Sequence, residues 1–131
     1  MGLTETQLAI IPGAGGCVRL PQVVGLAKAK ELILLGSRLT APEALEIGLV
    51  TQVLSSSNLQ KEAEAFTDAL LQGGPLALQA AKKVLQSCLG LTEEEALALE
   101  MQQSRSLVPS KDRMEALQAF HEKRAPLFRG E

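Results

Sequence analysis

Residues Glu5–Leu20 read ETQLAIIPGAGGCVRL, and this stretch carries more information than any other part of the sequence. The carboxylate of Glu5 stands seven residues before the turn Pro12–Gly16, which contains three glycines. Glycine tolerates positive φ and leaves backbone N–H groups uncovered, so a ligand or a catalytic water can approach the main chain closely. A carboxylate beside such a turn can form half of a general acid/base site. The local pattern also fits an exposed glutamate and a tight turn before a helix.

The composition fits one small domain without nucleic acid or membrane partners. The 131 residues suffice for a modest core, and 46% of them are hydrophobic. A net charge of −2 gives no bulk basic field for nucleic acid, and no apolar run reaches the length of a membrane span. Cys17 and Cys88 lack metal-ligand spacing and read as reduced thiols, although a disulfide between them remains open.

Helix signals dominate the chain. The apolar spacing predicts a helix over Leu26–Leu35 with Gly36 as its stop. Thr40 and Glu43 have capping-box spacing, and so do Thr92 and Glu95. Further helices are predicted over residues 59–71, 76–89, 92–106 and 109–124. Residues 49–54, LVTQVL, are the best strand candidate, and such a strand needs a partner elsewhere. The predicted fold class is mostly α with one or two short strands.

Five blocks of sequence form a larger pattern. They are residues 8–21, 29–50, 74–82, 111–115 and 119–126. In their order and spacing these blocks resemble the crotonase (enoyl-CoA hydratase/isomerase) family. Residues 1–5 and the Ile-Ile-Pro-Gly run look most like its methylglutaconyl-CoA hydratase subgroup and the close relatives of that subgroup.

The resemblance implies that this chain is the C-terminal half of a longer protein with the α/β crotonase (ClpP/crotonase) fold. Residues 1–131 would be a single domain, with the end of the crotonase core up to about residue 55. Residues from about 56 to 131 would form a helical oligomerisation region. The other half would carry the acyl-CoA-binding loop, both oxyanion-hole amides and a first catalytic carboxylate.

The resemblance also assigns four site residues. Glu5 corresponds to the second catalytic carboxylate, and the amide of Gly13 to a group that holds the catalytic water. Phe120 and Lys123 correspond to residues that reach the adenosine-phosphate end of CoA bound to a neighbouring subunit. From the local sequence alone, Gly13 also fits a turn glycine with positive φ, Phe120 a core residue and Lys123 a solvated one.

The chain departs from the family pattern near this turn. Cys17 and Val18 stand where Thr-Gln is usual, so a hydroxyl that would cap the following helix is lost. We read Cys17 as a buried small hydrophobic residue rather than a nucleophile. Leu3 and Thr4 occupy places often held by Gln and Pro. His121 is the only histidine and has no second ligand in sight, so no metal site is predicted.

The implied function is that of an acyl-CoA hydratase, a lyase that adds water to a 2,3-unsaturated acyl-CoA thioester. The CoA thioester is the substrate, and no metal or redox cofactor is implied. The expected assembly is a homotrimer or hexamer. The expected setting is fatty acid or branched-chain amino acid breakdown in a mitochondrial matrix or a bacterial cytoplasm.

Two other readings stay open at the level of sequence. A chain without the oxyanion hole cannot stabilise an enolate, so the chain would also fit a catalytically incompetent segment for oligomerisation or interaction. RNA binding is associated with the methylglutaconyl-CoA hydratase subgroup, but the net charge of −2 argues against it here.

Overall fold

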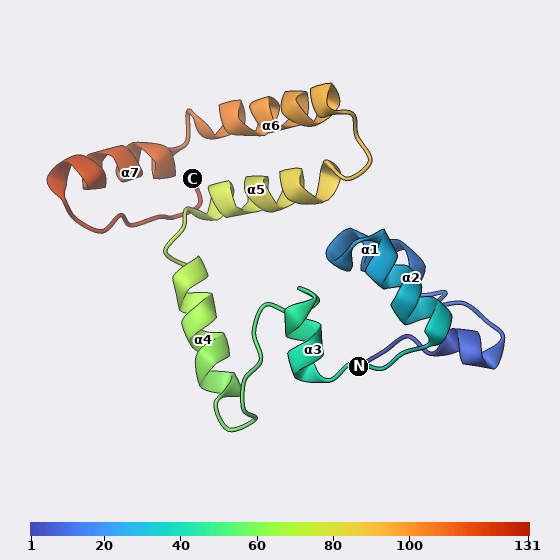
Figure 1. Ribbon diagram of the computed structural model, residues 1–131. Helices are drawn as coiled ribbons and strands as arrows, with labels where there is room; N and C mark the ends of the chain where they lie inside the picture. Colours follow the sequence, from blue (N-terminus) through green and yellow to red (C-terminus); the bar gives the residue numbers. More distant parts are fainter. The chain divides into compact units, whose positions relative to one another are not determined.

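The computed structural model describes all residues from 1 to 131 and is almost entirely helical (Figure 1). A short 3-10 helix, η1, is followed by the α-helices α1 to α7. Their bounds are η1 Glu5–Leu8, α1 Gly16–Val24, α2 Leu26–Leu35, α3 Ala41–Glu46, α4 Leu59–Leu70, α5 Pro75–Ser87, α6 Glu93–Leu107 and α7 Lys111–Glu122. The mostly helical prediction is confirmed.

The predicted strand over residues 49–54 is wrong. No β-strand forms, and the single β-bridge joins Gly2 to Arg38. The backbone N–H groups of Leu49 and Val50 instead donate to the carbonyl oxygen of Ala44, at 2.8 and 3.3 Å, and close the end of α3. A strand is stable only beside a partner, and this chain supplies no partner to the segment.

The helix ends follow the sequence closely. Gly36 ends α2 in the left-handed conformation, with φ 60°. The capping box of Thr40 with Glu43 is complete at the start of α3. Thr92 caps α6 in the same way with Glu95. In both boxes the threonine oxygen accepts a backbone N–H while the glutamate accepts the threonine's own N–H.

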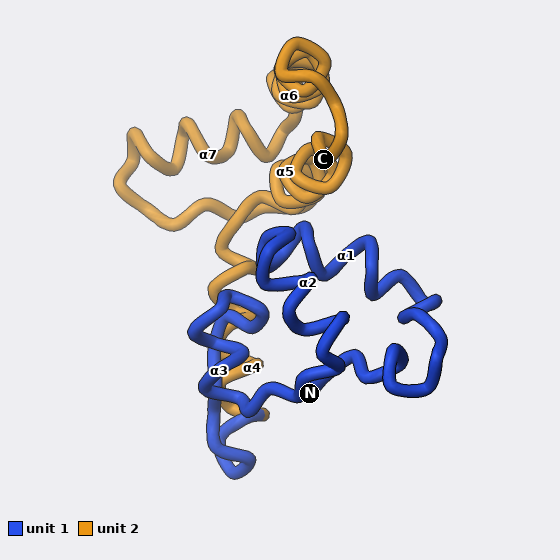
Figure 2. Tube along the Cα trace, turned by 45° about the vertical axis from the view of Figure 1, so that its right-hand side comes forward, with its two compact units in different colours: residues 1–59 blue, residues 60–131 orange.

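The contacts divide the chain into two compact units, residues Met1–Leu59 and Gln60–Glu131 (Figure 2). In the first unit, α2 packs against α1 and η1. The small core of this unit includes Ala29, Leu32 and Ile33, which all lie on α2. That these units form one domain stays a prediction.

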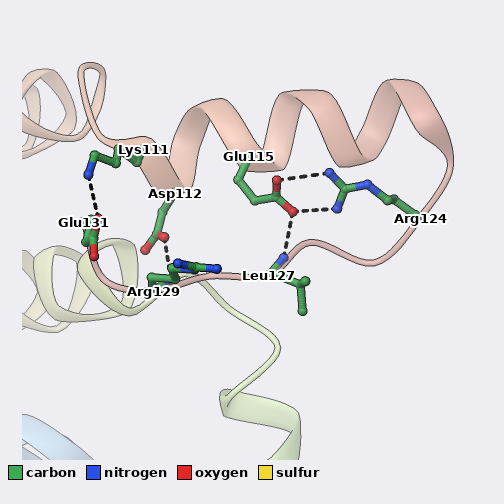
Figure 3. A pocket seen from close by; sticks show the side chains of 7 residues that line it. All are labelled: Lys111, Asp112, Glu115, Arg124, Leu127, Arg129 and Glu131. Carbon is green, nitrogen blue, oxygen red and sulfur yellow. Dashed lines mark hydrogen bonds and ion pairs between the residues drawn. The ribbon is translucent and has the colours of Figure 1, made fainter.

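The second unit contains the antiparallel pair α5 and α6, which lie side by side (Figure 1). After α7 the chain reverses, and the segment 126–131 runs back beside α7 (Figure 3). The buried residues of this unit are Asp112 and Ala119, both on α7. The second unit therefore has no large apolar core of its own.

Helix α4 is exposed along its whole length. Its large apolar side chains Leu59, Phe66 and Leu70 lie on one helical face and are 58%, 54% and 49% exposed. The amphipathic pattern that predicts this helix is therefore present, but nothing in the chain covers its apolar face.

Candidate functional site

Glu5 is the first residue of η1, and side-chain hydrogen bonds fix this short helix against α2. The hydroxyl of Thr6 donates to the carbonyl oxygen of Ile33 at 2.9 Å, and the amide of Gln7 donates to that of Leu35 at 3.4 Å. The side chain of Glu5 is half-buried, and its Oε2 atom is buried without any hydrogen-bond partner. A buried carboxylate oxygen is normally paired, so this one calls for an explanation.

The chain leaves η1 through a strained residue. Ala9 ends the helix in the left-handed conformation, with φ 57°. Its N–H donates to the carbonyl oxygens of Glu5 and Thr6. The left-handed region costs a residue with a side chain about 1–2 kcal/mol. Such strain tends to gather at functional sites, and here it directs the chain from the Glu5 helix toward the glycine turn.

Gly13 presents an open backbone in the turn. It does not have positive φ, so the alternative of a conformationally required glycine is wrong at this position. The residue with positive φ is Gly15, at 93°. A Cβ atom at Gly13 would meet only the carbonyl oxygen of Ile11, at 3.8 Å, and the N–H of Gly13 makes no hydrogen bond. The turn therefore exposes a free amide at the predicted site residue.

Gly16 is required by packing rather than by φ. A Cβ atom there would lie 2.6 Å from Cβ of Pro12 and 2.8 Å from Cδ1 of Leu3. Helix α1 begins at Gly16 without a side-chain cap, as the sequence suggested. Cys17 is exposed, so its prediction as a buried hydrophobic residue is wrong. In the first turn of α1, Gly16 packs against Pro12 and Leu3, whereas Cys17 is exposed to solvent.

Phe120 lies in the last turn of α7, and Lys123 follows three residues later, just beyond the end of the helix in the left-handed conformation. Phe120 is 85% exposed, so the reading of this ring as a core residue is wrong. Lys123 is exposed as well, and its ammonium group forms no ion pair or hydrogen bond in the chain. The end of α7 therefore carries an uncovered aromatic ring and, three residues later, a cation without an ion-pair partner.

Lys123 is the second residue with a side chain that takes positive φ, at 55°. The N–H of Lys123 donates to the carbonyl oxygen of Phe120 at 3.2 Å, and the N–H of Arg124 donates to that of Ala119 at 3.0 Å. These two bonds define a Schellman motif, in which glycine usually occupies the left-handed position. A lysine there carries strain that a glycine would avoid.

A network of ion pairs surrounds this helix end (Figure 3). The guanidinium group of Arg124 donates to both carboxylate oxygens of Glu115, at 2.6 and 3.0 Å, and to Glu122 at 2.6 Å. Glu115 also accepts the N–H of Leu127 at 2.9 Å. The hydrogen bonds from Arg124 and Leu127 lower the pKa of Glu115 to about 2. Glu115 is therefore ionised and fully engaged at any physiological pH.

Asp112 holds the chain further along. Its side chain is 6% exposed and accepts the N–H groups of Arg129 and Gly130, at 2.7 and 2.8 Å. Lys111 pairs with Glu131 at 2.7 Å. A hollow of about 560 Å³ lies between helix and returning chain, and it is lined by Lys111, Asp112, Glu115, Arg124, Leu127, Arg129 and Glu131. Two acids one helical turn apart thus tie the segment 126–131 to α7.

The contacts of Asp112, Glu115 and Arg124 were not predicted from the sequence. Their only signal was membership of the last two family-like blocks. Lys111 forms an ion pair, whereas Arg113 forms none. The structure places Glu5 and Gly13 on one short segment of the first unit, and Phe120 and Lys123 on one helix end of the second.

Comparison with known proteins decides the family. The family model for enoyl-CoA hydratase/isomerase matches residues 1–131, which is the entire chain.

The chain belongs to the enoyl-CoA hydratase/isomerase family. It is 46% identical to an enoyl-CoA hydratase/isomerase of Bacillus subtilis over 130 residues, which are 99% of this chain and 50% of the relative. It is 41% identical to human mitochondrial methylglutaconyl-CoA hydratase, covering 100% of this chain and 40% of the relative. The crystal structure of an enoyl-CoA hydratase from Bacillus anthracis matches 99% of this chain and 50% of its own, with a TM-score of 0.96 and 44% identity.

This member of the family spans about half the length of the relatives that it matches. No helix in the structure is both long enough and apolar enough to cross a bilayer.

Proposed function

We propose that this chain is the C-terminal half of an acyl-CoA hydratase, which adds water across the 2,3-double bond of an acyl-CoA thioester. Glu5 acts as one of two acid/base carboxylates, and the N–H of Gly13 helps to position the water. The order of the five family-like blocks supports the assignment to the C-terminal half. The similarity to an enoyl-CoA hydratase/isomerase and to a methylglutaconyl-CoA hydratase supports hydration of an unsaturated acyl-CoA as the reaction.

The unpaired Oε2 atom of Glu5 is the observation that carries the proposal. A carboxylate that served only the fold would have its buried oxygen paired. An unpaired oxygen keeps free lone pairs, so it can accept a proton from a bound water and return it to the substrate. The free N–H of Gly13 provides a donor that would hold the oxygen of such a water.

Phe120 and Lys123 supply the binding contact for the far end of the substrate. The exposed ring of Phe120 stacks on adenine, and the free ammonium of Lys123 pairs with a phosphate of CoA. We assign these contacts to CoA held by a neighbouring subunit of a homotrimer or hexamer. The other half of the enzyme supplies the oxyanion amides and the first catalytic carboxylate, and neither a metal nor a redox cofactor takes part.

The biological setting follows the relatives. The human relative is named as mitochondrial and as a methylglutaconyl-CoA hydratase, and another relative comes from Bacillus subtilis. We therefore propose a place in fatty acid or branched-chain amino acid breakdown, in a mitochondrial matrix or a bacterial cytoplasm.

The test is the Glu5→Gln variant of the full-length protein, assayed by hydration of crotonyl-CoA. Glutamine keeps the shape of the side chain but cannot exchange the proton. We expect kcat to fall about 10²–10⁴-fold, with KM and melting temperature little changed. Glu46→Gln, an exposed acid on α3, is the matched control and should leave kcat unchanged. An unaltered kcat in Glu5→Gln would sink the catalytic role.

A second candidate function is favoured by the uncovered apolar face of α4. In this reading the chain is a crotonase-like segment that assembles with partners but performs no chemistry. The 131-residue chain alone should hydrate crotonyl-CoA undetectably or very slowly under both readings, because it lacks the oxyanion amides. If the protein is a hydratase, the full-length protein should be active, and its activity should depend on Glu5. If it is an assembly segment, the full-length protein should be inactive.

A further inference from the structure

The end of α7 combines a strained lysine with an ion pair that spans it. Lys123 occupies the left-handed position of a Schellman motif, with φ 55° and ψ 38°. Arg124, the next residue, reaches back along α7 to Glu115 with two hydrogen bonds. A Schellman motif usually carries an apolar contact between the residue after the left-handed position and the helix. In this protein the bidentate ion pair between Arg124 and Glu115 replaces that apolar contact.

Glu115 binds the chain directly after Lys123. It binds the guanidinium group of Arg124 and the N–H of Leu127, while Asp112 holds the following N–H groups of Arg129 and Gly130. Figure 3 shows the bonds from Arg124 and Leu127 to Glu115 and from Arg129 to Asp112. A bidentate carboxylate–guanidinium pair fixes direction as well as distance. These bonds thus hold the backbone of Lys123 in the left-handed conformation, which is unfavourable for a lysine.

We propose that Glu115 is a positioning residue for Lys123. Through Arg124 and Leu127 it holds Lys123 in the left-handed turn, so that the ammonium group stays at the end of α7, three residues after the ring of Phe120. The pair then presents a preformed surface to the phosphate and adenine of an acyl-CoA. This inference rests on the phosphate-binding role of Lys123 in the proposed function. Neither Glu115 nor Arg124 needs to touch the ligand.

The experiment is a mutant cycle on the full-length protein, with CoA and 3′-dephospho-CoA as the calorimetric probes. Lys123→Gly removes the ammonium but keeps the turn, because glycine adopts the left-handed conformation without strain. We expect Lys123→Gly to weaken CoA binding about tenfold, the usual size of a charged hydrogen bond. Glu115→Gln should weaken CoA binding several-fold when Lys123 is present and cause no further loss in the Lys123→Gly background.

The cycle separates positioning from general support of the fold. A merely structural Glu115 would give the same loss in both backgrounds, and that result would overturn the proposal. A loss of affinity in Lys123→Gly with none in Glu115→Gln would overturn the positioning role alone. Unchanged affinity in Lys123→Gly would instead overturn the phosphate-binding role in the proposed function. The 3′-dephospho-CoA arm shows whether the 3′-phosphate is the group that Lys123 recognises.

Two further variants keep the test sound. Glu100→Gln removes an equal charge from an exposed acid on α6 and should leave CoA binding unchanged. Arg124→Lys keeps the charge but cannot form the bidentate pair, so it should reproduce the effect of Glu115→Gln if that variant folds poorly. Backbone NMR shifts of Lys123 in the 131-residue chain provide an independent readout. They should leave the left-handed range in Glu115→Gln, and unchanged shifts would contradict the proposal.

Discussion

Arg124 donates two hydrogen bonds to Glu115, at 2.6 and 3.0 Å, across nine residues of chain. One oxygen of the same carboxylate also accepts the N–H of Leu127 at 2.9 Å. Because these donors come from the chain that follows α7, a single side chain joins the helix to the segment after it. The ionisation of this carboxylate should therefore affect the free energy of unfolding of the protein.

The first prediction is an acid-sensitive contribution from Glu115. Its pKa in the folded protein is lowered to about 2 from an ordinary value of 4.5. A carboxyl group with a lowered pKa stabilises the fold fully above its ordinary pKa, and the contribution is lost as the pH falls through the folded value. We expect the free energy of unfolding, measured in urea, to drop between pH 4.5 and about pH 2. Glu115→Gln should flatten that drop, whereas Glu100→Gln should not. Equal profiles for both variants would contradict the prediction.

The second prediction separates two glycines of one turn. Gly13→Ala adds a methyl group to open space, so the free energy of unfolding should stay unchanged or rise by up to about 1 kcal/mol. If the N–H of Gly13 positions water, kcat of the full-length protein should nevertheless fall. Gly16→Ala forces a methyl group against Pro12 and Leu3 and should destabilise the fold by about 1–3 kcal/mol. Chemical denaturation and a hydration assay measure both effects, and a stable Gly13→Ala with full kcat would remove Gly13 from the site.

The third prediction concerns the strain at Ala9. Its φ of 57° suits glycine, so Ala9→Gly should stabilise the protein by about 1 kcal/mol. Ala81→Gly, at an exposed position in the middle of α5, is the matched control and should destabilise by a similar amount, because glycine weakens a helix interior. Differential scanning calorimetry distinguishes the two. A lowered melting temperature in Ala9→Gly would show that the turn is not strained.

The fourth prediction concerns the buried acid of α7. Asp112→Asn replaces one acceptor oxygen by an amide, so one of the N–H groups of Arg129 and Gly130 loses its partner. We expect a loss of about 1–3 kcal/mol in the free energy of unfolding. The exposed Asp68→Asn on α4 should cost little. Faster amide hydrogen exchange at residues 129 and 130 should accompany the loss, and unchanged exchange would contradict the assignment.

The fifth prediction is assembly. The apolar face of α4 and the near absence of large buried side chains leave surfaces that call for partners. We expect light scattering to report a trimer or a hexamer of the full-length protein. A well-folded monomer at micromolar concentration would contradict this. Phe66→Glu on α4 should weaken the assembly if that face is used, and Glu64→Gln on the same helix is the control.

The local structure could be predicted where the deciding chemistry was local. The capping boxes of Thr40 and Thr92 involve atoms three residues apart, so the sequence shows them directly. The prediction of a strand over residues 49–54 was wrong because a strand depends on a distant partner that no local pattern reveals. The predicted burial of Cys17 was wrong for the same reason, since it depends on which distant residues pack against α1.

The site was predictable as a set of positions but not as a set of contacts. The spacing of Phe120 and Lys123 placed both residues at the end of the last helix, but it did not show that Lys123 lies just beyond α7 in the left-handed conformation. The unpaired oxygen of Glu5 depends on how η1 meets α2, which the sequence does not show. The acceptor roles of Asp112 and Glu115 depend on N–H groups 12 to 18 residues further along the chain. A reversal of the chain over that distance lies beyond any helical periodicity.

The ion pair at the end of α7 also has a meaning for proteolysis. Trypsin must take the side chain of an arginine into its own binding pocket before it can cut the following bond. The guanidinium group of Arg124 is already held by Glu115 and Glu122, whereas Lys61 lies on the wholly exposed α4. Cleavage after Arg124 therefore requires the ion pair to open first. The ratio of the cleavage rate after Arg124 to the cleavage rate after Lys61 therefore measures how often the ion pair at the end of α7 opens.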